Sequence, residues 1–202
     1  DIKNFKLPNI GNKNFLSKLN KLLLKNRIKY IYPSHPEIIN FFNFNQKKIK
    51  AFVLLGATKT LNILEYKKKY LKLFNKESFY IKQYSDLENV DRYPIILKLN
   101  KGYGSKNLIK INSKIESYIY KNKNLTKYII QDFIPGKEYT VECLSNHKGK
   151  LVYVNARERF KIRMGTSFYS FDANRKIQKE SEKISKIISK KIKLIGVWFF
   201  QF

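Results

Sequence analysis

The feature that most constrains this fold is a short apolar strand that runs directly into a glycine-containing loop, YPIILKLNKGYGSK, at residues 93–106. The strand ends at Lys98, and Gly102, Gly104 and Ser105 follow in the loop. Glycine lets backbone N–H groups turn toward a bound anion, and a lysine at the strand end adds a fixed positive charge. The stretch therefore indicates a phosphate site, although the same residues are also typical of an ordinary hairpin turn.

Helical and strand patterns alternate through the first 65 residues. Leucine spacing predicts a helix over 15–26, and apolar β-rich runs predict strands over 28–32 and 51–55. A second helix is expected to be capped by Ser34, and a third to begin at Thr58 or Thr60. This order predicts an α/β unit with parallel strands.

Strand patterns dominate the rest of the chain. A lysine-rich helix is expected over 65–74 and another from Ser113. The residues after the glycine loop, 108–111, are expected to return antiparallel to the first strand. Further strands are expected over 128–134, 139–144, 151–159 and 196–202, the last one buried. The segment 160–174 is expected to be a loop, and 175–193 an amphipathic helix. The second half is therefore expected to form an antiparallel sheet.

The chain is strongly basic, with 42 Lys and Arg against 15 Asp and Glu and a formal net charge of +27. Such a charge suggests nucleic acid as a partner. However, the lysines are spread along the chain and accompany heavy use of Asn, Ile, Phe and Tyr, a composition typical of an AT-rich genome. We therefore interpret the charge as a solvated surface that binds polyanions weakly, and we expect no specific nucleic-acid partner.

Three further features limit the class of protein. Cys143 is the only cysteine, so no internal disulfide can form, and a reducing, cytoplasmic setting is expected. The longest apolar runs are too short to span a bilayer, so no membrane partner is expected. Because the sequence starts at Asp1 and stops within a strand pattern at Phe202, we expect a fragment that is truncated at both ends.

Five short segments follow one another in a recognisable order. They are EYKKKY at 65–70, PIILK with GYGSK at 94–106, IIQDFIPGKEYTVE at 129–142, RER at 157–159 and GVWFFQF at 196–202. Together they resemble the motifs of the ATP-grasp domain, in particular its carbamoyl-phosphate-synthase-like branch. The resemblance implies an α/β (α+β) fold of two lobes with antiparallel sheets. It also implies domain limits: a partial Rossmann-like pre-grasp domain over 1–65, and a grasp domain over 66–202 with a small lobe at about 67–134 and a large lobe at about 135–202.

The resemblance also implies a set of residues that bind ATP. Lys67 and Lys98 would neutralise phosphate charge from two sides, and the loop with Gly102, Gly104 and Ser105 would close over the γ-phosphate. The predicted hinge that contacts adenine comprises Gln131, Asp132, Phe133 and Ile134, and Glu138 would accept hydrogen bonds from the ribose. Gln131 stands where the family usually has glutamate, and its amide oxygen can accept the same bond.

The reaction implied by the family is activation of a carboxylate by ATP, through an acyl phosphate, for attack by an amine. The chain would thus be an ATP-dependent ligase, with Arg157, Arg159 and Arg163 holding the carboxylate or the acyl phosphate. Magnesium would bridge the phosphates, and Gln201 matches one of the family's metal contacts. The family's other metal ligands, a Glu and an Asn, lie on a strand beyond Phe202. We therefore expect poor catalysis by this chain.

Each of these residues also has a plainer interpretation. Lys98 and Lys67 fit exposed lysines, Glu138 fits a cross-strand surface partner, and Arg157 and Arg159 fit a salt-bridged sheet surface. Two alternatives to a ligase also remain open for the whole chain, namely a non-catalytic nucleotide-binding domain and a basic RNA-binding protein.

Overall fold

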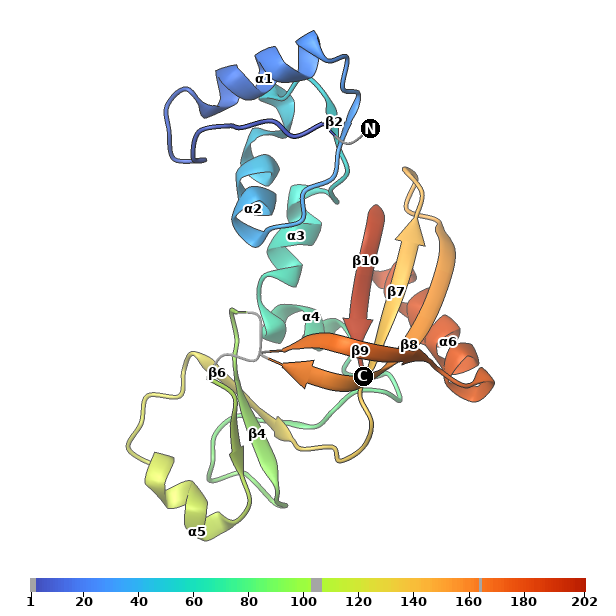
Figure 1. The fold of residues 1–202 in the computed structure, drawn as a ribbon. Coiled ribbons are helices and arrows are strands. Elements are labelled where there is room, and N and C mark those ends of the chain that lie inside the picture. Colours follow the sequence, from blue (N-terminus) through green and yellow to red (C-terminus); the bar gives the residue numbers. More distant parts are fainter. Residues whose placement is uncertain (1–2, 103–106, 164) are drawn as a thin grey trace.

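The architecture is given by a computed structural model that describes residues 3–102, 107–163 and 165–202. Its strands form one two-stranded sheet, β1-β2, and two four-stranded sheets, ordered β3-β6-β4-β5 and β10-β7-β8-β9. Figure 1 shows the N-terminal helical region at the top and the two larger sheets on either side below it. Every pairing within these two sheets is antiparallel, so the predicted α+β class is confirmed.

The N-terminal region packs helices against a very short parallel pair of strands. Its elements are α1 (Phe15–Lys25), β1 (Tyr30–Ile31), α2 (Pro36–Asn45), the 3-10 helix η1 (Gln46–Lys48), β2 (Phe52–Val53) and α3 (Thr58–Leu64). Because α1 presents Phe15, Leu19 and Leu23 at a spacing of four residues, one apolar face packs on Phe42 and Val53. The expected parallel pairing is confirmed, whereas a partial Rossmann-like domain over 1–65 remains a prediction.

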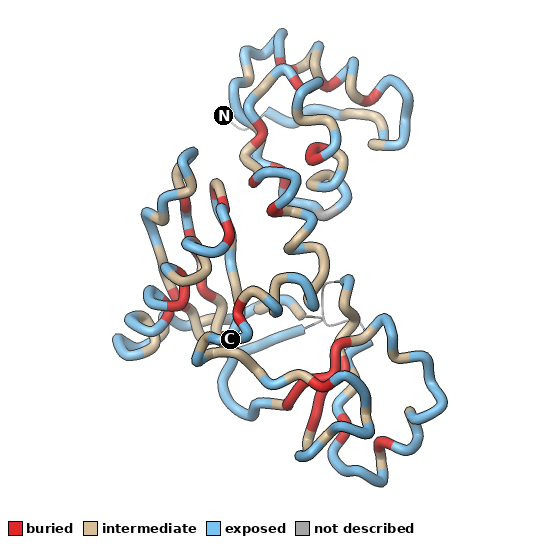
Figure 2. The backbone as a smooth tube through the Cα atoms, turned by 180° about the vertical axis from the view of Figure 1, so that it is seen from behind, coloured by how far each residue is buried: buried red, intermediate tan, exposed pale blue. Residues whose placement is uncertain are grey.

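The first four-stranded sheet contains the apolar strand that precedes the glycine-containing loop. Its strands are β3 (Gln83–Tyr84), β4 (Ile95–Leu99), β5 (Ile109–Ile111) and β6 (Tyr128–Asp132). The return of β5 antiparallel to β4 is confirmed. Two short helices, α5 (Lys114–Ser117) and η2 (Tyr118–Tyr120), connect β5 to β6, and Ser113 caps α5 as expected. Buried β4 and β6 form the core of this region, which is visible as the red segments at the bottom of Figure 2.

The second four-stranded sheet is covered on one face by a long helix. It consists of β7 (Tyr139–Ser145), β8 (Leu151–Arg163), β9 (Thr166–Asp172) and β10 (Gly196–Gln201), with α6 (Arg175–Lys191) packed against it. Alternate residues of β7 face the helix, where the Cys143 Sγ lies 3.3 Å from the Ser185 Oγ. The prediction that Cys143 is a core residue is confirmed, and burial raises the pKa of its thiol to about 11.

Three details of the sequence prediction were wrong. The segment 160–174 is no loop: β8 continues to Arg163 and turns at Gly165 into β9, which pairs with it. The N-cap of α2 is His35 rather than Ser34, because the His35 Nδ1 accepts a hydrogen bond from the Glu37 N–H. The strand at 196–202 is only half buried. Since β10 is an edge strand with α6 on one side, its alternate residue Phe199 is exposed.

The helix α4 (Lys67–Leu73) lies where the two larger sheets approach each other (Figure 1). Along the chain it links the N-terminal region to β3 and β4, and Phe74 at its end packs with Ile192 and Leu194, which follow α6. The boundary predicted near residues 134 and 135 falls in the connection between β6 and β7. Within the described ranges, the chain has no helix long and apolar enough to cross a membrane.

Candidate nucleotide site

The N-terminus of α4 is tied to the end of β4. The Lys67 N–H donates to the Asn100 carbonyl at 2.8 Å, and the Lys68 N–H donates to the Asn100 side-chain oxygen at 2.9 Å. The Lys67 ammonium then reaches across and donates to the Gly102 carbonyl at 2.8 Å. Asn100 thus positions the predicted phosphate lysine, a role that the sequence analysis missed. The signal was a polar residue directly after the strand, where a helix N-terminus needs acceptors.

Lys98 and Lys67 lie near each other, while their contact with phosphate stays a prediction. Burial lowers the pKa of the Lys98 ammonium, and the nearby Glu138 carboxylate partly offsets this effect. Burial also lowers the pKa of Lys67, and the positive charge of Lys98 lowers it further. Among the described residues, neither ammonium forms an ion pair with a carboxylate within 4.0 Å. Two lysines, 31 residues apart in sequence, therefore concentrate positive charge at one end of β4.

The two faces of the β3-β6-β4-β5 sheet have different surroundings. Side chains alternate along a strand, and the register pairs Lys98 with Ile129 and Ile96 with Gln131. Lys98 and Gln131 therefore lie on the same face. The opposite face carries Leu97 and Ile130, which belong to the apolar core of this region. The structure thus places Gln131, predicted to lie beside adenine, on the same face as Lys98, which is predicted to contact phosphate.

The backbone of the predicted hinge is partly engaged by the protein itself. The Asp132 N–H donates to the Lys82 carbonyl at 3.1 Å, and the Phe133 N–H donates to the Pro94 carbonyl at 3.1 Å. Ile134 follows beyond β6, and its N–H has no protein acceptor within the part of the chain that the structure describes. Of the N–H groups of Asp132, Phe133 and Ile134, that of Ile134 is therefore the one that is open to a ligand.

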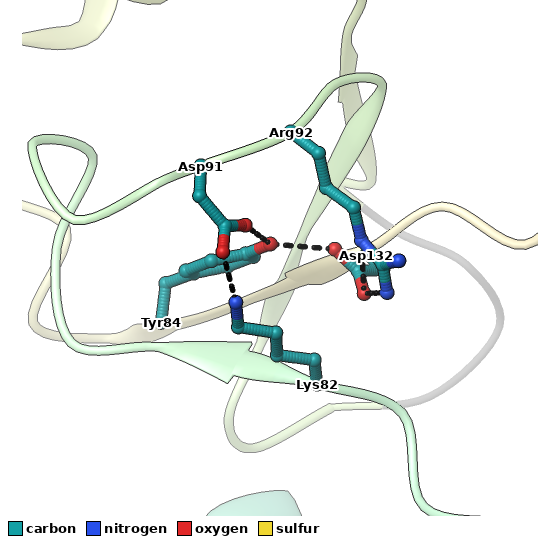
Figure 3. A network of polar contacts seen from close by, with 5 residues as sticks. All are labelled: Lys82, Tyr84, Asp91, Arg92 and Asp132. Carbon is teal, nitrogen blue, oxygen red and sulfur yellow. Dashed lines mark hydrogen bonds and ion pairs between the residues drawn. The ribbon is translucent and has the colours of Figure 1, made fainter.

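The Asp132 side chain belongs to a polar network rather than to the nucleotide face (Figure 3). Its Oδ1 accepts from the Tyr84 hydroxyl at 2.8 Å, and its Oδ2 accepts from the Arg92 Nε at 3.0 Å. The same hydroxyl lies 2.7 Å from Asp91 Oδ1, and Asp91 pairs with Lys82. The guanidinium of Arg92 holds the pKa of Asp132 below its usual range. The sequence offered one signal of this network, a carboxylate at the end of the mostly buried strand β6, because a buried carboxylate requires hydrogen-bond or charge partners.

The predicted residues of the second sheet share the face opposite α6. Glu138, which immediately precedes β7, alternates along the chain with Glu142, and the register places Arg157 beside Thr140 and Gln201. The Arg159 N–H donates to the Glu138 carbonyl at 2.8 Å, which continues the same pairing. Glu138 lies close enough to Lys98, on the first sheet, for its negative charge to act on the pKa of that lysine.

Both arginines of the predicted RER motif are already paired with carboxylates. Arg159, whose side chain is only 5% exposed, donates to Glu138 and, at 2.6 Å, to the Gly165 carbonyl. Arg157 forms an ion pair with Glu142. Each arginine has a buried Nε without a partner among the described residues. Arg163 lies at the end of β8 beyond two register irregularities, so strand alternation does not place it with the other two.

The remaining predicted site residues are the metal contact Gln201 and the loop residues Gly102, Gly104 and Ser105. Gln201 supplies one neutral oxygen on the shared face. No group of three or more His, Cys, Asp and Glu side chains that could hold a metal occurs in the described ranges. These residues alone therefore do not make a magnesium shell. Gly102 adopts a φ of +146°, a conformation that favours glycine. Gly104 and Ser105 lie outside the described residues.

Comparison of the sequence with protein families gives one assignment. A family model described as an ATP-grasp domain matches residues 44–199, which is more than half of the chain. No curated protein sequence matches the chain.

Solved structures with a similar fold include ligases and carboxylases. The biotin carboxylase domain of Hydrogenobacter thermophilus 2-oxoglutarate carboxylase, in complex with MgADP, ADP and bicarbonate, has a TM-score of 0.73 and 13% identity, covering 98% of this chain and 50% of that one. N5-carboxyaminoimidazole synthetase from Staphylococcus aureus, complexed with ADP, has a TM-score of 0.69 and 15% identity, covering 96% and 54%. An L-amino acid ligase from Bacillus licheniformis has a TM-score of 0.64 and 13% identity, covering 96% and 50%. The chain thus spans about half the length of these proteins, and at such identities the likeness establishes the fold.

Proposed function

The chain belongs to the ATP-grasp family, and from this premise we propose that it binds ATP between its two four-stranded sheets. We further propose that the parent reaction is that of an ATP-dependent ligase. A carboxylate oxygen of the substrate attacks the γ-phosphorus, ADP leaves, and the resulting acyl phosphate is attacked by an amine, which releases phosphate. The small lobe at about 67–134 and the large lobe at about 135–202 would be the two halves of the grasp.

The observation that carries this proposal is the pair of lysines at the end of β4. Two ammonium groups that are partly removed from water, close together and without a carboxylate ion pair among the described residues, lower the stability of the free protein. A polyphosphate placed there would supply the missing negative charge. The Lys67 ammonium also donates to the Gly102 carbonyl. The lysine proposed to contact phosphate is therefore bonded to the first glycine of the loop sequence that continues to Gly104 and Ser105.

The hinge supports adenine rather than a bare polyphosphate as the other half of the ligand. The Phe133 N–H bonds to Pro94, which continues the ladder one residue past β6. In an extended strand, the carbonyl of one residue and the N–H of the second residue after it point to the same edge. The Asp132 carbonyl and the Ile134 N–H therefore offer an acceptor and a donor side by side, which suits the amino group and the neighbouring ring nitrogen of adenine. Gln131 adds a side-chain acceptor.

The residues of the second sheet would contact different parts of the ligands. The Glu138 carboxylate is largely exposed although it is paired with Arg159, so one oxygen remains accessible to ribose hydroxyls. Arg157, Arg159 and Arg163 remain the proposed contacts of the substrate carboxylate or the acyl phosphate. Magnesium would arrive with the nucleotide and neutralise phosphate charge, with Gln201 as its proposed protein contact. None of the other assignments depends on that contact.

The test is nucleotide binding by the purified chain. Calorimetric titration with MgATP is expected to show binding, and Lys98→Ala should weaken it by about 10- to 100-fold, since a charge-assisted contact is worth about 1.5–3 kcal/mol. Lys114→Ala removes an exposed lysine from α5 and serves as the matched control, with affinity unchanged.

The same titration also tests the alternatives. Unchanged affinity in Lys98→Ala would overturn the site. Binding of MgATP without measurable release of phosphate would favour a non-catalytic nucleotide-binding domain. Salt-sensitive binding of RNA that is tighter than binding of ATP would favour the RNA-binding alternative.

A further inference from the structure

Asp132 and the residue after it, Phe133, are held by contacts with Lys82, Tyr84, Arg92 and Pro94, all from the single segment 82–94. Two are made by the Asp132 side chain, with Tyr84 and Arg92, and two belong to the main chain, from Asp132 N–H to Lys82 and from Phe133 N–H to Pro94. Figure 3 shows the segment passing over Asp132, with Tyr84 and Arg92 reaching it from two sides. The Asp132 side chain is only 3% exposed, so water cannot replace these contacts.

The charges of this network cancel, but it has fewer hydroxyl donors than carboxylate acceptors around Tyr84. Asp91 and Asp132 are matched by Lys82 and Arg92. Between the two carboxylates lies the single hydroxyl of Tyr84, which can donate only one proton to two acceptors. Burial among these carboxylates raises the pKa of Tyr84 well above its usual value, which keeps the hydroxyl in its donating form. The Arg92 side chain is 64% exposed, so the cation that neutralises the buried Asp132 lies at the protein surface.

Little else fixes the hinge on its outer side. A hollow of about 240 Å³ lies against it, lined by residues that include Arg92, Pro94 and Ile134. The Ile134 side chain is exposed and does not anchor the backbone by packing. The position of the Ile134 N–H therefore depends on the residues immediately before it, which are held by the network.

We propose that Tyr84 and Arg92 are positioning residues for adenine recognition. They act through Asp132, whose buried carboxylate they hold on the core face of β6. This fixes the Asp132 carbonyl and the Ile134 N–H at the spacing that the adenine edge requires. The inference rests on the proposed nucleotide site and adds to it the residues that give the site its base preference.

The experiment compares two nucleotides that share phosphates and ribose. ADP presents an amino group and an acceptor nitrogen at the base edge, whereas inosine diphosphate presents a carbonyl and an N–H, which cannot pair with the same hinge. Affinities of both would be measured calorimetrically for the unmodified chain, Tyr84→Phe and Arg92→Gln. Tyr118→Phe, on the exposed η2, removes a hydroxyl elsewhere on the same region and is the control. Arg92→Gln removes the positive charge beside Asp132 but keeps an amide donor for it, and the circular dichroism spectrum of each variant is recorded first to confirm that it is folded.

We expect the unmodified chain and Tyr118→Phe to prefer ADP. In Tyr84→Phe and Arg92→Gln, ADP binding should weaken by about three- to tenfold, while inosine diphosphate binding stays unchanged. A merely structural role would weaken both nucleotides equally, and that result would overturn the inference, as would unchanged ADP affinity in both variants. An unmodified chain that binds both nucleotides without preference would overturn it too. Failure of the unmodified chain to bind either nucleotide would instead refute the proposed function, and this inference with it.

Discussion

The cations at the end of β4 and those on β8 lie in opposite electrostatic situations. Lys67 and Lys98 are near each other, and the pKa of each is lowered by burial. Arg157 and Arg159 lie on the other sheet, and each is paired with a carboxylate of Glu142 or Glu138. The two lysines therefore leave net positive charge at the end of β4, whereas the charges of Arg157 and Arg159 are offset by Glu142 and Glu138.

This difference distinguishes cations that bind a ligand from cations that support the fold, which the residue types alone do not distinguish. A buried cation without a carboxylate partner is available to a ligand and lowers the stability of the free protein, whereas a cation that is paired with a carboxylate is part of the structure. We infer that the lysines act chiefly on ligand charge. The arginines hold Glu138, Glu142 and the Gly165 carbonyl in place. An arginine that also contacts a substrate would do so while it remains bonded to these groups.

The largest effect on stability is expected from Arg159→Ala. This change removes a buried guanidinium that bridges Glu138 and the Gly165 carbonyl, so the free energy of unfolding should fall by about 2 kcal/mol. Urea denaturation measures it. Arg163→Ala, at the exposed end of β8, is the control and should change stability by less than about 0.5 kcal/mol. Equal stabilities of the two variants would show that Arg159 is not structural.

A smaller effect of opposite sign is expected from Lys98→Met. Burial holds the pKa of Lys98 in the folded protein below its ordinary value of 10.5. At pH values between the folded-state pKa and 10.5, the unfolded chain therefore binds more protons than the folded protein. The buried charge therefore costs stability at pH 7, and the cost disappears as the pH rises toward 10.5. Lys98→Met should be more stable than the unmodified chain by about 0.5 kcal/mol at pH 7, and the difference should shrink at higher pH.

The control for that measurement is Lys101→Met. The pKa of Lys101 is raised beside Glu65, so its removal should shift stability in the opposite direction. If Lys98→Met were less stable than the unmodified chain at neutral pH, the contrast between unpaired lysines and paired arginines would be wrong.

The smallest effect is expected from Glu142→Gln. Glu142 and Arg157 are each 41% exposed at their side chains, and exposed pairs contribute little. The free energy of unfolding should change by less than about 0.5 kcal/mol, and the change should vanish in high salt. A loss above about 1 kcal/mol would mean that Arg157 is as structural as Arg159.

Much of the fold followed from local patterns, and the failures have identifiable causes. The strand β4, its return in β5 and the amphipathic α6 were predicted because hydrophobic periodicity is a local property. The β8–β9 hairpin was missed because its aromatic and basic residues lack a simple alternation and its register is irregular. The exposure of Phe199 was missed because the sequence does not show which face of the sheet is left uncovered by α6, whereas its neighbours Trp198 and Phe200 pack on the covered face.

The candidate site divides in the same way. By itself, the sequence determined the residue types that a nucleotide site needs, namely Lys98 at a strand end, glycines after it and a polar hinge in β6. Only the tertiary structure decided which of these groups face one another. It brought Lys67 beside Lys98, paired Arg159 with Glu138, and turned Asp132 away from the nucleotide face toward Tyr84 and Arg92. The physical reason is that the availability of a charge depends on its distance to other charges and to water, and long-range packing sets both.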